Sequence, residues 1–166
     1  MSFPILSFFT GGGFLDLGFN QAGFRTCWTN ENNPAFVRGY NFGMSSWLSS
    51  MDKTRRVEIA ISNSSSICDL SASQVIAEAF SSLAPSLYGV IGGPPCPDFS
   101  NGGTHAGGEG VNGRLTTVFV DMLCTLNPPF FVIENVPGLC RFHKHREFFK
   151  KKIFQLEKIG YFVDYK

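Results

Sequence analysis

The sequence has few of the features that mark a secreted or membrane protein. Its five cysteines are an odd number and include no Cys-x-x-Cys pair, which favours a reducing cytosol over a disulfide framework. The apolar start, Phe3 to Phe9, has no basic segment before it and is too short to span a bilayer. We therefore expect a cytoplasmic protein with no targeting signal and no membrane partner.

Strong net charge is also lacking, because the formal charge at pH 7 is only +1. Any binding of a polyanion would have to use a local patch. One such patch runs from Arg141 to Lys152, where basic residues stand against the single acid Glu147. Two interpretations of it stay open, a solvated helix face and a contact for phosphate groups.

Short apolar runs alternate with amphipathic helical stretches, without repeats or low-complexity linkers. This alternation predicts an α/β fold in one domain, residues 1–166, with a mostly parallel sheet and helices on both faces. We expect strands at Ile5–Phe9, Phe24–Thr29, Ile67–Cys68, Tyr88–Ile91, Phe130–Ile133 and Tyr161–Val163. We expect helices at Leu15–Gln21, from Pro34, from Ser71 through Leu83, at Leu115–Leu126 and at Arg146–Ile159. The serine-rich stretch 44–66 fits no element.

Polar residues and glycines follow the predicted strands at their carboxyl ends, where open parallel sheets bind ligands. We expect Gly11, Glu31, Asp69, Cys96 and Glu134 to converge there. A glycine turn before a helix, with an acid some twenty residues later, predicts a nucleotide whose ribose is held by Glu31. The sequence has no Gly-Lys-Ser/Thr, which disfavours a P-loop nucleotide hydrolase. Asp69 could bind an adenine amine or simply begin a helix, and Glu134 could be a solvent-facing strand end.

The stretch Gly92 to Ser100, GGPPCPDFS, presents a cysteine on a stiff loop. Proline fixes φ, so Pro94, Pro95 and Pro97 restrict the backbone around Cys96. A buried structural thiol is the commonest fate of a cysteine. A loop of turn-formers followed by the glycine-rich segment 101–113 instead indicates a nucleophile.

These motifs together resemble the N-terminal part of the catalytic domain of cytosine-5 DNA methyltransferases. The matching segments are LSFFTGGGFLDLGFNQAGF over 6–24, GGPPCPDFS over 92–100 and FVIENVPGL over 131–139. The resemblance implies a Rossmann-like S-adenosylmethionine-dependent methyltransferase fold, incomplete at its C-terminus. It also implies methylation of carbon 5 of a flipped-out cytosine in double-stranded DNA, typical of a bacterial restriction-modification system.

The resemblance assigns roles by position. The residues implied to bind S-adenosylmethionine, with S-adenosylhomocysteine as product, are Phe9, Gly11, Gly12, Gly13, Phe14, Glu31, Asn32, Asp69, Leu70, Pro95 and Leu115. Cys96 is implied as the nucleophile and Glu134 as the acid that holds the base. Pro95, Ser100, Asn135 and Val136 are the implied substrate contacts.

The sequence departs from the family pattern at three places. Pro97 stands where a glutamine usually follows the nucleophile, and Phe14 replaces a usual glycine of the cofactor turn. The later arginine-containing motif, the target recognition region and the final helix of the family are not found in the sequence. We therefore expect residues 1–166 to be a fragment, a truncated gene product, or one half of a split enzyme whose second chain supplies these parts.

The sequence also leaves alternatives to methylation of DNA open. One is a non-catalytic or split-enzyme subunit, and another is an RNA cytosine-5 methyltransferase, since Cys96 and Glu134 would serve an RNA base equally well. A nicotinamide dehydrogenase is disfavoured by the proline-framed cysteine. Cys140, His143 and His145 are three potential ligands within six residues and have no distant partner, which is a poor zinc pattern, so no metal is expected.

Overall fold

The structure is a computed structural model that describes residues 3–51, 54, 57–80, 87–95, 111–136 and 143–165. It divides into two compact units. The first consists of Met1–Gly93 with Pro128–Ile133, and the second of Pro94–Asn127 with Glu134–Lys166.

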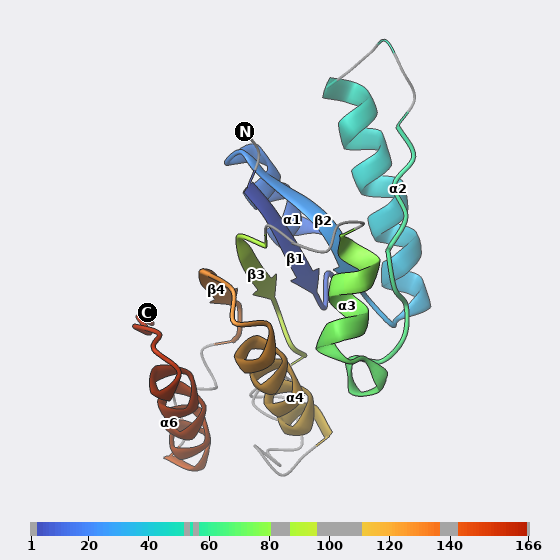
Figure 1. Ribbon diagram of the computed structural model, residues 1–166. Helices are drawn as coiled ribbons and strands as arrows, with labels where there is room; N and C mark the ends of the chain where they lie inside the picture. Colours follow the sequence, from blue (N-terminus) through green and yellow to red (C-terminus); the bar gives the residue numbers. More distant parts are fainter. Residues whose placement is uncertain are drawn as a thin grey trace. The chain divides into compact units, whose positions relative to one another are not determined.

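The first unit is built on a parallel sheet of four strands, drawn as arrows in Figure 1. The strands are β1 (Phe3–Phe8), β2 (Phe24–Asn30), β3 (Gly89–Gly92) and β4 (Phe130–Ile133), in the order β2-β1-β3-β4. Strands β1 and β3 are central and almost wholly buried, as expected of apolar runs in a parallel sheet. The predicted parallel sheet is therefore confirmed.

Two helices of the first unit cover opposite faces of this sheet (Figure 1). Helix α1 (Phe14–Gln21) receives a hydrogen bond from Ser7 of β1, whereas helix α3 (Ala72–Ala79) accepts one from Trp28 of β2. The Trp28 ring packs on Phe8, and consecutive residues of a strand, such as Ser7 and Phe8, point to opposite faces. The prediction of helices on both faces is confirmed for this unit.

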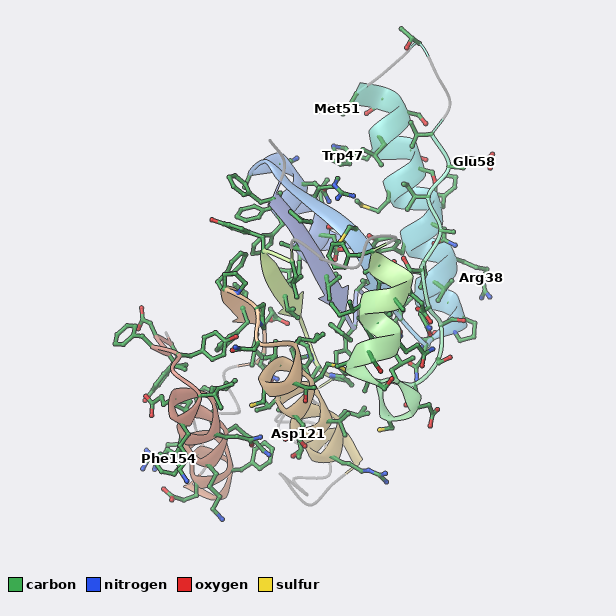
Figure 2. All side chains as sticks on the ribbon, in the orientation of Figure 1. Arg38, Trp47, Met51, Glu58, Asp121 and Phe154 are labelled. Carbon is green, nitrogen blue, oxygen red and sulfur yellow. The ribbon has the colours of Figure 1, made fainter. Side chains whose placement is uncertain are left out.

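Helix α2 (Pro34–Met51) extends well into the stretch that the sequence pattern left unassigned. Its side chains at 41, 45 and 49 accept the backbone N–H groups of residues 61, 59 and 57, at 2.8, 2.8 and 3.0 Å. Residues 57–61 therefore run along the helix, held by polar side chains one turn apart. Figure 2 shows Arg38, Trp47 and Met51 along α2, with Glu58 on the neighbouring segment.

Three predicted elements are corrected by the structure. Residues 67–69 form the 3₁₀ helix η1 (Ile67–Asp69), not a strand. The reason is that the Ser66 side chain accepts the Cys68 N–H and the Ser66 carbonyl accepts the Asp69 N–H. Helix α3 has the predicted Ser71 cap, with Gln74 N–H donating to Ser71 Oγ at 3.2 Å, but it ends at Ala79. Phe80, which follows, has an extended backbone. Residues 161–165 form no strand, since no strand that the structure describes pairs with them.

Aromatic rings fill the amino ends of the four strands. Each strand begins with, or is preceded by, one aromatic residue: Phe3, Phe24, Tyr88 and Phe130. Phe19 of α1 packs with them, and the centroids of the contacting rings lie 4.6 to 6.3 Å apart. We call these five residues the aromatic end. Gly89 leaves room for the Phe130 ring, because a Cβ at position 89 would overlap that ring.

The second unit contains helices α4 (Val111–Leu126) and α6 (His143–Lys158). The Gln155 side chain of α6 donates to Asp121 of α4 at 2.7 Å, while Phe154 on α6 is exposed (Figure 2). Within the described part of the chain, no helix is both long enough and apolar enough to cross a bilayer.

Candidate functional site

The turn from β1 into α1 has an unusual backbone. Phe9, Gly11 and Gly13 have positive φ values of 53°, 53° and 83°, and the Gly13 N–H donates to the Thr10 carbonyl at 2.8 Å. Glycine adopts this left-handed region freely, whereas Phe9 is strained in it. We call residues 10–13 the glycine turn. It leads into a helix as predicted, and glycines at such a turn let a ligand approach the backbone closely.

Glu31, at the carboxyl end of β2, is tied directly to the glycine turn. Its Oε2 accepts the Gly11 N–H at 2.9 Å, and its Oε1 accepts the Asn33 N–H at 2.8 Å. The residue is only 8% exposed. Each carboxylate oxygen has a second lone pair, so Glu31 can also accept hydrogen bonds from a pair of ligand hydroxyls. The structure thus brings Glu31 and the glycine turn together, as the sequence predicts.

Thr10 provides a second polar group at this turn. Its side chain is 7% exposed, and its Oγ1 has no hydrogen-bond partner among the residues that the structure describes. A buried hydroxyl without a partner carries a free-energy cost of about 1–3 kcal/mol. A polar ligand at the glycine turn would remove that cost, so the residues present fit a nucleoside-type cofactor.

Asp16, in the first turn of α1, is the charged residue nearest in sequence to the glycine turn, and it is fully buried. Its Oδ2 accepts a hydrogen bond from Ser7 at 2.9 Å, and its Oδ1 accepts one from Tyr40 of α2 at 3.2 Å. Burial raises the pKa of Asp16 to about 6, and burial together with the Asp16 carboxylate raises the pKa of Tyr40. The sequence prediction missed both residues. A carboxylate within the apolar run Leu15-Asp16-Leu17 was the available signal.

Tyr40 also limits what can stand at Gly13. A Cβ on Gly13 would lie 2.9 Å from the Tyr40 ring, closer than real side-chain contacts. Position 13 therefore requires glycine for two reasons, its backbone conformation and this close approach.

Phe14 begins α1 and is 83% exposed. A Cβ built on Gly12 would lie 3.3 Å from its ring, so the ring stands beside the glycine turn. Phe14 was predicted to bind the cofactor, and its position beside the turn is compatible with that role.

The other predicted cofactor residues of the first unit lie on the segments that follow Glu31 and precede α3. Asn32 and Asp69 are exposed, and Leu70 is half-buried. The backbone of this region is anchored at Asn63, whose carbonyl accepts the Glu31 N–H at 3.3 Å. The roles of these three side chains stay predictions.

The remaining predicted residues belong to the second unit or lie outside the described residues. Leu115 on α4, Pro95 and Asn135 are half-buried, while Glu134 and Val136 are exposed. Asn135 Oδ1 accepts the Val136 N–H at 2.8 Å. Cys96, Pro97 and Ser100 lie outside the described residues, so the proposed nucleophile stays a prediction.

Among the residues that the structure describes, no group of three His, Cys, Asp or Glu residues is placed to hold a metal ion. Cys140 and the side chains of His143 and His145 lie outside that part of the chain.

Comparison with known proteins decides the family. The model of the C-5 cytosine-specific DNA methylase family matches residues 3–166. The chain belongs to this family. The resemblance inferred from the three sequence motifs is thereby confirmed.

Individual relatives agree with this assignment. The chain is 42% identical over 95% of its length to the Type II methyltransferase M.NmeDI of Neisseria meningitidis serogroup C. It is 33% identical over its whole length to the Type II methyltransferase M.MthTI of Methanothermobacter thermautotrophicus. The chain spans 37% and 43% of the lengths of these two relatives.

Solved structures confirm the fold. A candidate DNA modification methyltransferase encoded within an E. coli prophage superposes with a TM-score of 0.69, at 26% identity, over 95% of this chain and 38% of its own. The Dnmt2 methyltransferase of S. pombe superposes with a TM-score of 0.60 over 93% of this chain and 40% of its own. At 16% identity, the second likeness supports the fold alone.

Proposed function

We propose that residues 1–166 form the cofactor-binding and catalytic domain of a DNA (cytosine-5)-methyltransferase that uses S-adenosylmethionine and serves in restriction-modification. The observation that carries the proposal is the bond between the Glu31 carboxylate and the Gly11 N–H, at 2.9 Å. It joins an acid suited to ribose hydroxyls with a glycine turn that lets a ligand approach the backbone closely. The family match and the Type II methyltransferases among the relatives support the same activity.

The cofactor would be held by the residues that the family resemblance assigns to it. Glu31 would accept the ribose hydroxyls, and Gly11, Gly12 and Gly13 would let the ligand approach the backbone. The remaining cofactor contacts would come from Phe9, Phe14, Asn32, Asp69, Leu70, Pro95 and Leu115. When bound, the cofactor supplies a methyl group on a positively charged sulfonium.

Cys96 would act as the nucleophile. Carbon 5 of cytosine is a weak nucleophile, so the Cys96 thiolate would first form a bond to carbon 6 and make the ring electron-rich. Glu134 would hydrogen-bond ring nitrogen 3 and stabilise that adduct. Carbon 5 would then take the methyl group as the sulfur–methyl bond breaks. Loss of the carbon 5 proton to a base would expel the Cys96 thiolate and restore the ring.

The base would have to leave the duplex to reach these groups. Pro95, Ser100, Asn135 and Val136 are the residues that we propose to contact the flipped nucleotide. The parts of the relatives that this chain does not match would come from elsewhere in the same polypeptide or from a second chain.

Covalent trapping tests the proposal. The chain would be incubated with S-adenosylmethionine and a duplex containing 5-fluorocytosine, alone and with a C-terminal complement from a related enzyme. Because fluorine cannot leave as a proton does, the thioether to carbon 6 should persist as a stable adduct. We expect an adduct that Cys96→Ser abolishes. An adduct on an RNA strand but not on DNA would favour the RNA enzyme, and cofactor binding without any adduct would favour the non-catalytic subunit.

A further inference from the structure

We propose that the buried carboxylate of Asp16 makes the glycine turn prefer the cationic S-adenosylmethionine over the neutral product S-adenosylhomocysteine. The inference rests on the proposed function, because it takes these two molecules as the ligands of the turn. It makes Asp16 a specificity-determining residue that acts through its charge, without touching the cofactor.

The first step of the argument is that Asp16 is buried without a counter-charge. The side chain has 0% of its surface exposed. Its two oxygens accept hydrogen bonds from hydroxyl groups, those of Ser7 and Tyr40. No lysine or arginine among the described residues forms an ion pair with it. Hydrogen bonds from neutral donors stabilise a carboxylate without neutralising its net charge, which the partial positive charge at the N-terminus of α1 offsets only in part.

The second step is position. Asp16 stands three residues after Gly13, within the first turn of α1. Tyr40 links the two, since its hydroxyl donates to Asp16 at 3.2 Å and its ring packs against Gly13. A ligand on the backbone of the glycine turn would therefore lie near the carboxylate, across protein of lower dielectric constant than water.

The third step is the chemistry of the two ligands. S-adenosylmethionine and S-adenosylhomocysteine share the adenosine and the amino acid end, and they differ by one methyl group and one positive charge at sulfur. Contacts to ribose, adenine and backbone stabilise both alike. A buried negative charge stabilises only the sulfonium, and this differential effect is what selects one ligand over the other.

The ionisation of Asp16 sets the pH range of this preference. Burial raises its pKa to about 6, so the carboxylate is charged at neutral pH and loses its charge in mild acid. The groups that face it are Ser7 from β1, Thr26 from β2 and Tyr40 from α2. Tyr40 is the titratable one of these, and its raised pKa keeps it neutral over the same range.

The test is calorimetric titration of the chain with each ligand at about pH 7.5 and about pH 5. The quantity compared is the ratio of the two dissociation constants, which cancels general damage to the site. Since the two ligands differ by one unit charge that the carboxylate attracts, we expect S-adenosylmethionine to bind about fivefold to tenfold more tightly than S-adenosylhomocysteine. Asp16→Asn should remove that preference at about pH 7.5, and acid should remove it from the unchanged chain.

Tyr40→Phe is the matched control, because it deletes a hydrogen bond to Asp16 and keeps the charge. It should weaken both ligands by the same factor and leave the ratio unchanged. A ratio that neither Asp16→Asn nor acid alters would overturn the inference. If Asp16→Asn does not fold, the pH series on the unchanged chain decides alone. A chain that binds neither ligand at either pH would overturn the proposed function itself, and the inference with it.

Discussion

The two ends of the parallel sheet are built from opposite kinds of residue. At the amino ends of the strands, the five rings of the aromatic end pack on one another and on Gly89. The carboxyl ends of β1 and β2 carry the glycine turn and the buried acid Glu31. One end of the sheet thus supplies apolar burial for stability, whereas the other carries polar groups that can bind a ligand.

The two ends also differ in how their backbone is held. At the carboxyl end, left-handed conformations at Phe9, Gly11 and Gly13 are fixed by hydrogen bonds to Thr10 and Glu31. Strained backbone of this kind persists where the surrounding structure holds it, commonly at functional sites. Changes at this end should therefore alter ligand binding, and changes at the aromatic end should alter folding alone.

The largest expected effect concerns Asp16 and pH. Its pKa is raised from the ordinary 3.8 to about 6, so the folded chain holds this proton more tightly than the unfolded chain. The contribution of Asp16 to the free energy of unfolding is therefore fully present below about pH 4 and is lost as the pH rises through about 6. Relative to Asp16→Asn, the unchanged chain should lose about 3 kcal/mol between those limits. Urea unfolding across this range measures the difference, and a constant difference would contradict the assignment.

Gly89→Ala tests the aromatic end. The added Cβ would lie 2.3 Å from the Phe130 ring, so we expect overpacking to lower the free energy of unfolding by about 1–3 kcal/mol. The affinity of the folded fraction for S-adenosylmethionine should not change. Gly18→Ala is the matched control, because a Cβ at that helix position meets no atom within 4 Å. Equal destabilisation by both substitutions would show that the packing at Gly89 is not the cause.

Glu31→Gln tests the carboxyl end with a smaller energetic effect. An amide has one acceptor oxygen, so it cannot keep both backbone N–H partners and also accept two ribose hydroxyls. We expect the dissociation constant for S-adenosylmethionine to rise about tenfold, measured by calorimetry. Glu58→Gln makes the same change at an exposed acid and should leave the affinity unaltered. Unchanged affinity in Glu31→Gln would remove Glu31 from the site.

Much of the fold could be predicted from the sequence, because buried parallel strands are short apolar runs bounded by turn residues. Phe130–Ile133 was located to the residue, and the glycine turn before α1 was correct. The pattern failed at Ile67–Cys68, where two apolar residues suggested a strand and the Ser66 cap produced a 3₁₀ helix instead. Short runs carry too little periodicity to separate the two.

The site was predictable where a sequence motif marks it. The pairing of Glu31 with the glycine turn followed from their positions at the ends of adjacent strands. Asp16 and Tyr40 did not follow, since their interaction depends on how α1 and α2 pack in three dimensions over 24 residues of sequence. A buried polar cluster of this kind has no local sequence signal beyond a charged residue in an apolar run.

The central claim is that the carboxyl ends of β1 and β2 hold S-adenosylmethionine. The most direct measurement is a titration of the ¹⁵N-labelled chain with S-adenosylmethionine, followed through its backbone amide resonances. We predict that the amides of Gly11, Gly12, Gly13 and Glu31 shift with one common dissociation constant, while those of Gly89 and Phe130 do not. Shifts centred on the aromatic end, or none at the glycine turn under saturating ligand, would contradict the account.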